Sequence, residues 1–276
     1  MTTVAYLGPE KTNTHEAAIA RFGKGVKYVH APTIDDVFHL VERRVADYGV
    51  VPVENSLQGA VTHTLDRFID FMDTPVYIQG DIQRPIKHYL IMKRKWRLQD
   101  VKAVFSHPQV LAQCRGWLSQ HLPHAMKREA SSTARAVWIA LHNYRSPAAA
   151  IGRKELARGH NVKVRVRSIP LELENKTRFL ILGYGEPVRG RRNKTSILFS
   201  LKDKPGALHD SLVPFKKHRL NLTKIESRPS KRKAWEYYFF IDVEGHESDL
   251  RMKRALRALK ARVAHFRILG SYPIGR

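Results

Sequence analysis

Apolar residues in the first 183 positions form short buried runs that alternate with amphipathic stretches. The apolar runs predict strands at residues 4–7, 48–53, 76–82, 86–92, 103–105 and 178–182. The amphipathic stretches predict helices at residues 15–22, 34–45, 61–72, 108–118 and 132–142. Thr33 is expected to cap the second helix, because two acidic residues follow in its first turn, and Thr12 or Thr14 is expected to cap the first. This alternation is typical of a layered α/β domain.

One further strand has a distinct pattern. Residues 162–167 alternate strictly between valine and a basic residue. Because side chains alternate between the two faces of a strand, we expect Lys163, Arg165 and Arg167 to face water.

The pattern changes after residue 183. Residues 184–194 are rich in glycine, proline and basic residues and predict a linker. Beyond them we expect a strand at 196–202, a helix at 206–218, strands at 222–228 and 235–243, a helix at 248–263 and a strand at 266–270. This βαββαβ order is that of a ferredoxin-like domain. The predicted organisation is a first domain at 1–183, whose second subdomain occupies about 79–164, and a second domain at 195–276.

Composition adds a strong positive charge. The 276 residues include 49 Lys and Arg against 25 Asp and Glu, for a formal net charge of +24. That balance suits nucleic acids, membrane surfaces or anionic metabolites as partners. The basic residues are dispersed and are not interleaved with aromatic residues, so we expect no specific nucleic-acid binding and only weak polyanion binding at residues 189–194 and 231–233.

Several other classes are excluded. The single cysteine, Cys114, rules out an internal disulfide framework and a cysteine-rich zinc site. The chain has no apolar stretch of transmembrane length and no secretory signal, so a reducing, cytoplasmic setting without membrane partners is expected. It also lacks a P-loop, a dinucleotide-binding glycine motif and metal-ligand spacing of Cys and His, so no metal or organic cofactor is expected.

Polar clusters follow four of the predicted strands, where open α/β sheets bind ligands. They are residues 8–14, 52–59, 106–109 with Gln113, and 175–179. Their hydroxyl, amide and guanidinium groups, two of them near a predicted helix N-terminus, would together suit an anionic ligand. For any one cluster taken alone, capping and turn chemistry is the simpler interpretation.

Taken together, these segments resemble the prephenate dehydratase family. The matching motifs are Tyr-Leu-Gly-Pro-Glu at 6–10, Val-Pro-Val-Glu-Asn-Ser at 51–56, Ser-His-Pro-Gln at 106–109 and Thr-Arg-Phe at 177–179. Gly-Ala-Leu-His at 206–209, Glu-Ser-Arg-Pro at 226–229 and the segment 235–242 resemble the family's ACT regulatory domain. The resemblance covers essentially the whole chain. It implies a two-lobed catalytic domain like a periplasmic binding protein, with the active site between the lobes, followed by a ferredoxin-like ACT domain. The chorismate mutase fused to some relatives is not expected.

The resemblance also implies a reaction. Prephenate would lose its ring carboxylate as CO2 and its 4-hydroxyl as water, giving phenylpyruvate. Thr177 matches the threonine assigned to departure of the hydroxyl, and Glu54 would either orient its neighbours or take part in proton transfer. The other catalytic positions implied are Asn55, Ser106 and Gln113.

Substrate contacts follow from the same motifs. Arg178 is the best candidate for a prephenate carboxylate, because a guanidinium binds carboxylate through two parallel hydrogen bonds. The remaining expected substrate contacts are Thr12, Ser56 and Phe179.

The second domain is expected to sense phenylalanine. Gly206, Ala207 and Leu208 open a predicted helix, whose free N–H groups suit an amino-acid carboxylate. The resemblance adds four further effector contacts: Asn221, Glu226, Ser227 and Arg228. It also implies a homodimer or homotetramer, because ACT sheets commonly pair edge to edge.

The sequence departs from the family at three positions. Lys11 and Asn13 stand where the family has Gly and Phe, and Gln58 stands where Glu is common. If the position of Lys11 needs a positive φ, a lysine there is strained. Two alternatives therefore stay open: an arogenate dehydratase, and a non-catalytic ligand-binding sensor in which the altered loop abolishes turnover.

Overall fold

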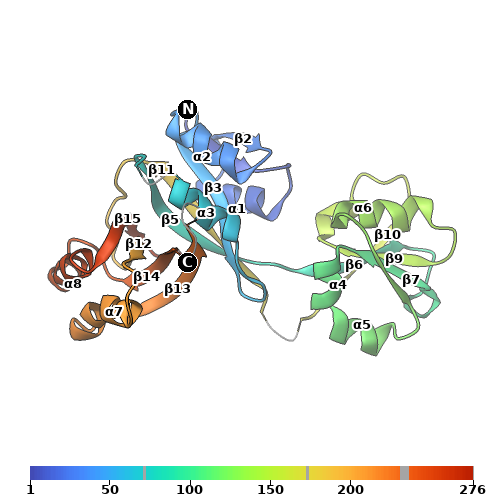
Figure 1. The fold of residues 1–276 in the computed structure, drawn as a ribbon. Helices are drawn as coiled ribbons and strands as arrows, with labels where there is room; N and C mark the ends of the chain where they lie inside the picture. The colour runs from blue at the N-terminus through green and yellow to red at the C-terminus, as the bar shows by residue number, and fades with distance from the viewer. Residues whose placement is uncertain (71–72, 172–173, 231–235, 276) are drawn as a thin grey trace. The chain divides into compact units, whose positions relative to one another are not determined.

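The computed structural model describes residues 1–70, 73–171, 174–230 and 236–275 (Figure 1). The chain forms two compact units, one of Met1–Arg84 with Lys176–Arg276 and one of Pro85–Asn175. The second unit is shifted from the predicted 79–164. The reason is that β5 (Val76–Pro85) stays in the first unit's sheet, whereas β10 (Val164–Ile169) pairs with β6 (His88–Lys93) of the second.

The first sheet of the first unit has the strand order β2-β1-β3-β11-β5, with β4 paired to β3. Strand β1 runs parallel to its neighbours, whereas β11 is antiparallel to β3. The elements of this layer are β1 (Thr3–Leu7), α1 (Asn13–Phe22), β2 (Lys27–Ala31), α2 (Ile34–Glu42), β3 (Tyr48–Asn55), β4 (Gly59–Ala60), α3 (Thr62–Asp70) and β11 (Lys176–Tyr184).

Helix starts in this layer follow the predicted caps. The Thr12 hydroxyl accepts a hydrogen bond at the start of α1, and Thr33 forms a capping box with Asp36 at the start of α2. The predicted end of α2 is wrong, because Val45 lies beyond the helix and is exposed. The last two residues predicted for α3, 71 and 72, lie outside the described residues.

The C-terminal domain has the predicted βαββαβ order. Its antiparallel sheet has the order β13-β14-β12-β15, and α7 and α8 lie side by side on one face (Figure 1). The elements are β12 (Asn193–Leu201), α7 (Ala207–Lys217), β13 (Leu222–Pro229), β14 (Tyr237–Glu244), α8 (Leu250–Lys260) and β15 (Val263–Pro273). The predicted start of the third strand, residue 235, lies outside the described residues.

The other face of this sheet packs against the first sheet. Leu198, Phe240 and Leu269 of the C-terminal sheet share one apolar cluster with Phe68 and Leu180. The rings of Phe68 and Phe240 have centroids 6.4 Å apart. The C-terminal domain and the first lobe therefore share a core, which the pattern of a linker at 184–194 did not predict.

The second unit has the strand order β10-β6-β9-β7-β8. Its other elements are η1 (Leu98–Asp100), β7 (Ala103–Ser106), α4 (Pro108–Gln113), α5 (Arg115–His121), β8 (Met126–Glu129), α6 (Thr133–Trp138), η2 (Ile139–Asn143), β9 (Ala148–Gly152) and η3 (Lys154–Ala157). The single helix predicted at 108–118 is two helices divided at Cys114. Lys163, Arg165 and Arg167 are exposed, as predicted.

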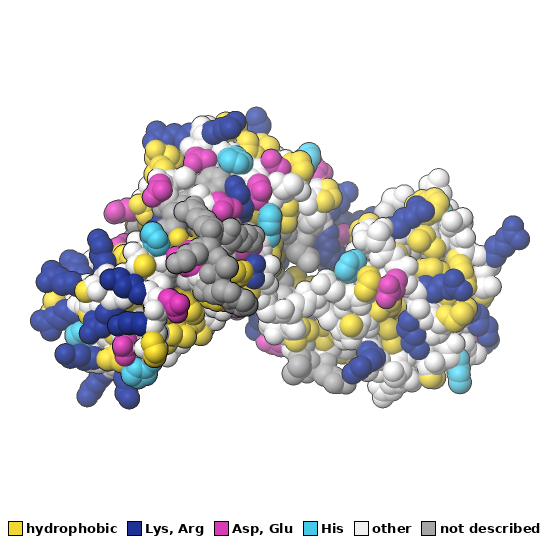
Figure 2. All heavy atoms as spheres, in the orientation of Figure 1, with side chains coloured by type: hydrophobic (Ala, Val, Ile, Leu, Met, Phe, Trp, Pro, Cys, Tyr) yellow, Lys and Arg dark blue, Asp and Glu magenta, His cyan; other side chains and the backbone are white. Residues whose placement is uncertain are grey.

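Part of the positive charge lies on the helices of the C-terminal domain. Figure 2 shows Lys and Arg side chains gathered over α7 and α8. On α8 the exposed basic residues are Arg251, Lys253, Arg254, Arg257 and Lys260. In the part of the chain that the structure describes, no helix is both long and apolar enough to span a membrane.

Candidate active site

Asn55 and Thr177 form the central polar pair of the first unit. They are directly opposite in the antiparallel β3–β11 ladder, and the Asn55 Nδ2 donates a hydrogen bond of 2.9 Å to Thr177 Oγ1. Asn55 Oδ1 accepts from the backbone N–H groups of Leu57 (3.0 Å) and Gln58 (3.2 Å), which fixes the orientation of the amide. Because the Thr177 oxygen accepts from Asn55, its own O–H is available to donate to a ligand.

Glu54 and Arg178 form the next pair along the same ladder. Since side chains alternate along a strand, this pair lies on the face opposite Asn55 and Thr177. A bulge between Arg178 and Phe179 shifts the register there. Phe179 lies in the apolar core with Tyr6 and is 1% exposed, so the structure places it away from the expected substrate contact.

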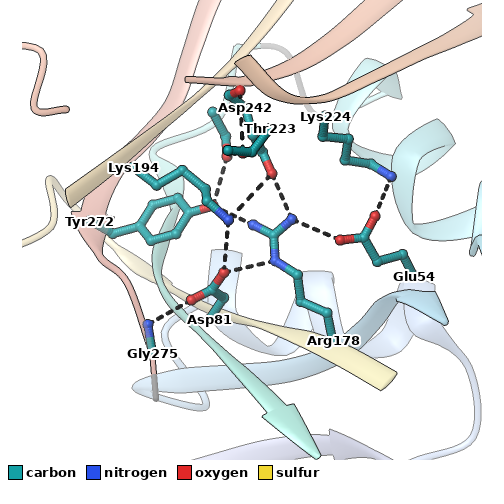
Figure 3. A network of polar contacts seen from close by, with 10 residues as sticks. Glu54, Asp81, Arg178, Lys194, Thr223, Lys224, Asp242, Tyr272 and Gly275 are labelled. Carbon is teal, nitrogen blue, oxygen red and sulfur yellow. Dashed lines mark hydrogen bonds and ion pairs between the residues drawn. The ribbon is translucent and has the colours of Figure 1, made fainter. Parts of the chain in front are cut away.

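Arg178 lies at the centre of a buried ion-pair network (Figure 3). Its Nε donates to Asp81 Oδ2 (2.7 Å), Nη1 to Asp242 Oδ2 (2.6 Å) and Glu54 Oε1 (3.1 Å), and Nη2 to the Tyr272 hydroxyl (2.9 Å). The residue is 5% exposed. These four bonds occupy most of the guanidinium N–H groups, which argues against the expected contact between Arg178 and a substrate carboxylate.

The C-terminal domain supplies most of this network. Lys224 Nζ donates to Glu54 Oε2 (2.5 Å), and Lys194 Nζ lies 3.4 Å from Asp81 Oδ2. All four strands of the C-terminal sheet contribute. Lys194 and Ser196 lie on β12, Lys224 on β13, Asp242 on β14 and Tyr272 on β15. Sequence reasoning missed these residues. One signal in the sequence could have identified them. A charged residue inside an apolar strand, such as Asp242, indicates a buried ion pair, because a buried charge needs a partner.

The electrostatics hold this network in its charged form. Burial alone would lower the pKa of Arg178, but Tyr272, Asp242 and Asp81 around it raise that pKa above its usual value. Burial alone would raise the pKa of Glu54, but the hydrogen bond and charge of Lys224, together with Arg178, lower it. Glu54 is therefore a carboxylate near neutral pH, which favours an orienting role over proton transfer.

The loop before α1 holds two of the predicted positions. Thr12 Oγ1 donates to the Leu7 carbonyl (3.2 Å) and accepts from the His15 N–H (3.3 Å), so its hydroxyl serves as the helix cap. Lys11 has φ 63°, in the left-handed region, where the family has glycine. Ser56 is exposed, and its Oγ accepts from the Lys176 N–H at 2.9 Å.

In the second unit, Ser106 and Gln113 differ in accessibility. Ser106 is fully buried and its hydroxyl donates to the Ile151 carbonyl (2.7 Å), which makes it a structural contact rather than the expected open donor. Gln113 is half-buried, and its Oε1 accepts from Asn175 Nδ2 (2.9 Å) and lies 2.7 Å from His88 Nε2. Burial lowers the pKa of His88, so a neutral ring donates to Gln113. The Gln113 amide oxygen is therefore occupied by these two donors.

A separate pocket of about 520 Å³ lies in the C-terminal domain. Three of the predicted effector residues line it, namely Gly206, Ala207 and Leu208. The pocket also includes Leu201, Lys202, Asp203, Lys204, His209, Glu236, Tyr237, Phe239 and Ala264. Gly206 has φ 76°, so a residue with a side chain would be strained there even though the space is open.

The other four predicted effector residues, Asn221, Glu226, Ser227 and Arg228, are not among the described residues that line this pocket. Asn221 Nδ2 donates to Glu244 (3.2 Å). Arg228 binds Asp66 of α3 through two hydrogen bonds of 2.8 and 3.1 Å. Arg228 therefore anchors β13 to the first lobe.

No group of three or more His, Cys, Asp or Glu residues is placed to hold a metal ion within the described ranges of the chain. The acidic side chains at the site instead bind Arg178, Lys194 and Lys224.

The chain combines a layered α/β domain with a ferredoxin-like C-terminal domain. The family model for prephenate dehydratase matches residues 4–187, and that for the ACT domain matches residues 195–261. The chain belongs to the prephenate dehydratase family.

Three similar proteins align with 90% or more of this chain. It is 46% identical to a bifunctional chorismate mutase/prephenate dehydratase of Aquifex aeolicus over 98% of this chain and 73% of that protein. It is 38% identical to a prephenate dehydratase of Methanocaldococcus jannaschii over 90% and 88% of the two chains. The crystal structure of Arthrobacter aurescens prephenate dehydratase in complex with L-Phe superposes with a TM-score of 0.85 and 31% identity, covering 100% of this chain and 90% of that one. The predicted fold class is confirmed.

Proposed function

We propose that the chain converts prephenate to phenylpyruvate. The C–C bond to the ring carboxylate breaks and CO2 leaves. The electron pair of that bond enters the ring and expels the 4-hydroxyl as hydroxide, which takes a proton from solvent and departs as water. Aromatisation of the ring drives the step. Membership of the family and the geometry of Thr177 support this proposal.

The single observation that carries the mechanism is the direction of the Asn55–Thr177 hydrogen bond. Asn55 donates to Thr177 Oγ1, so the Thr177 O–H is directed to donate to the departing hydroxyl. A threonine hydroxyl keeps its proton at neutral pH, so it acts by a positioned hydrogen bond to the charge that develops on oxygen. Gln113, in the second unit, stays a predicted catalytic position.

Turnover of prephenate by the purified protein tests this proposal, with phenylpyruvate followed by its absorbance in alkali. Thr177→Val removes the hydroxyl and is expected to lower kcat by about 100-fold or more. Thr177→Ser keeps the hydroxyl and should stay within about tenfold of the wild type. Arogenate is assayed beside prephenate to decide between the two substrates. A folded wild type that binds prephenate without turnover would establish the sensor alternative instead.

We further infer that phenylalanine binds the C-terminal pocket and lowers turnover. The volume suits an amino acid with an aromatic side chain, and Tyr237 and Phe239 supply aromatic walls. The first turn of α7 has N–H groups that suit the carboxylate. Calorimetry should show phenylalanine binding that Gly206→Ala weakens about tenfold, since strain at a positive φ costs about 1–2 kcal/mol. Gly159→Ala, at φ 79° in the second unit, is the matched control and should bind normally.

We also propose a cytoplasmic homodimer or homotetramer joined at the C-terminal sheet. Strand β13 is at one edge of that sheet, and its Ile225 is 48% exposed. An exposed edge strand invites pairing with a second copy. Light scattering should give a mass of two or four chains, and Ile225→Arg should shift it toward one chain. A monomeric wild type would refute this assembly.

A further inference from the structure

Two cross-strand pairs of charged residues in the first unit, one in the β3–β11 ladder and one in the β13–β14 ladder, form ion pairs with each other. Lys224 on β13 and Asp242 on β14 are direct register partners, as are Glu54 on β3 and Arg178 on β11. Lys224 binds Glu54 (2.5 Å), Asp242 binds Arg178 (2.6 Å), and Arg178 binds Glu54 (3.1 Å). We call these four residues the charge quartet (Figure 3).

The quartet is largely shielded from water. The side chains of Arg178, Asp242 and Lys224 are 6%, 7% and 12% exposed, and that of Glu54 is 30% exposed. Shielded ion pairs of fixed geometry resist separation, because parting them leaves a charge unpaired in a poorly solvated site. Movement of the β13–β14 ladder is therefore transmitted to the β3–β11 ladder.

On the catalytic side, the quartet adjoins the proposed reacting group. Glu54 precedes Asn55, and Arg178 follows Thr177, on the opposite face of one ladder. A rotation of the ladder that reorients Glu54 must also change the geometry between Asn55 Nδ2 and Thr177 Oγ1.

On the effector side, the quartet shares strand β14 with the pocket. Tyr237 and Phe239 of β14 line the pocket, and Asp242 lies on the same strand. Strand β13 is held at two points. Arg228 is bound to Asp66 and Lys224 to Glu54. A ligand that displaces β14 thus acts on β13 through their ladder, and the Lys224 end of β13 is the end that meets the catalytic ladder.

We propose that Lys224 is a positioning residue that couples the C-terminal pocket to Thr177 through Glu54. This inference rests on the proposed function, in which phenylalanine in that pocket lowers turnover. Lys224 touches neither ligand. Its role is to hold the Glu54 carboxylate, and so the ladder, in the orientation that the occupied pocket changes.

The test compares Lys224→Met, Lys224→Arg and Lys253→Met. Lys253 is an exposed lysine of α8 and is the matched control. Phenylalanine affinity is measured by calorimetry, and kcat and KM for prephenate are measured with and without saturating phenylalanine. The phenylalanine affinity of Lys224→Met should stay within about threefold of that of the wild type. The factor by which saturating phenylalanine lowers its turnover should nevertheless fall by at least about fivefold, which is the lower end of the range for coupling between two sites. Lys224→Arg keeps the positive charge and should restore inhibition, whereas Lys253→Met should behave as the wild type.

Lys224→Met with wild-type inhibition, or an active wild type that phenylalanine does not inhibit, would overturn the inference. Asp242→Asn weakens the second link between the ladders, and it provides an independent variant if Lys224→Met does not fold. Failure of the proposed function is seen separately, as a wild type without prephenate turnover. In that case the effect of phenylalanine on prephenate binding still measures the coupling, because coupling between two binding sites is reciprocal.

Discussion

The Asn55 side-chain amide donates a 2.9 Å hydrogen bond to the hydroxyl of Thr177, which lies 122 positions later in the chain. The antiparallel β3–β11 pairing brings them together, and two backbone N–H groups fix which end of the Asn55 amide faces Thr177. The direction of this bond determines whether the threonine can donate to a substrate.

Asn55→Asp should reverse that direction. A carboxylate accepts hydrogen bonds only, so the Thr177 hydroxyl would turn its proton to residue 55 and away from the substrate. We expect kcat for prephenate to fall by about 100-fold with a smaller change in KM, as for loss of a transition-state donor. Steady-state kinetics measure this, with Asn161→Asp on an exposed loop as control. A kcat equal to that of the control would remove Asn55 from the mechanism.

Much of the architecture was predictable because it depends on local patterns. Thr33 and Asp36 sit at capping-box spacing, and the βαββαβ order follows from the hydrophobic periodicity after residue 193. Strands β2, β4, β8 and β9 were missed. For β8 and β9 the reason is that four exposed residues at 126–129 and an Ala-rich run at 148–152 carry weak strand signals. The second unit's boundary was misplaced because β10 has no local feature that identifies its partner strand.

The candidate site was less predictable than the fold. The motif at 177–179 drew attention to its three residues, but burial assigns them different environments. Thr177 is half-buried beside Asn55, Arg178 is enclosed by acids, and Phe179 is in the core. The partners of Arg178 come from strands more than 60 residues away, and no local pattern specifies such pairings.

Arg178→Lys should lower the stability of the protein more than its affinity for substrate. One ammonium group cannot replace the four hydrogen bonds of the guanidinium, so buried Asp81 and Asp242 would lose partners. We expect a loss of about 3–5 kcal/mol in the free energy of unfolding, measured with urea. An unchanged stability together with a raised KM for prephenate would instead support the carboxylate contact first expected for Arg178.

Glu54→Gln should remove a pH-dependent part of the stability. The pKa of Glu54 is lowered on folding from an ordinary value of 4.5, because Lys224 and Arg178 outweigh burial. A carboxyl group whose pKa is lowered contributes stability above its unfolded pKa and loses it as the pH falls through its folded pKa. The wild type should therefore be more stable than Glu54→Gln at pH 7, and the difference should shrink below about pH 4.5. Glu10→Gln, which is exposed, controls for removal of one negative charge, and a gap that stays constant with pH would contradict the assignment.

Lys11→Gly tests whether the altered loop limits the enzyme. Lys11 adopts φ 63°, a conformation that costs an L-residue about 1–2 kcal/mol but costs glycine nothing. Glycine also gains freedom in the unfolded chain, worth about 0.4–1 kcal/mol, so the two effects nearly cancel. We expect the variant to be as stable as the wild type or up to about 1 kcal/mol more stable in urea unfolding, whereas Lys253→Gly inside α8 should lose about 1 kcal/mol.

Activity then separates strain in this loop from loss of the family's aromatic residue at position 13. If backbone strain alone mattered, Lys11→Gly would raise kcat/KM for prephenate by itself. Because Thr12 already caps α1 with its normal geometry, we expect little change from Lys11→Gly alone and a larger gain when Asn13→Phe is added. A double variant no more active than the wild type would show that the chain works fully with its own loop.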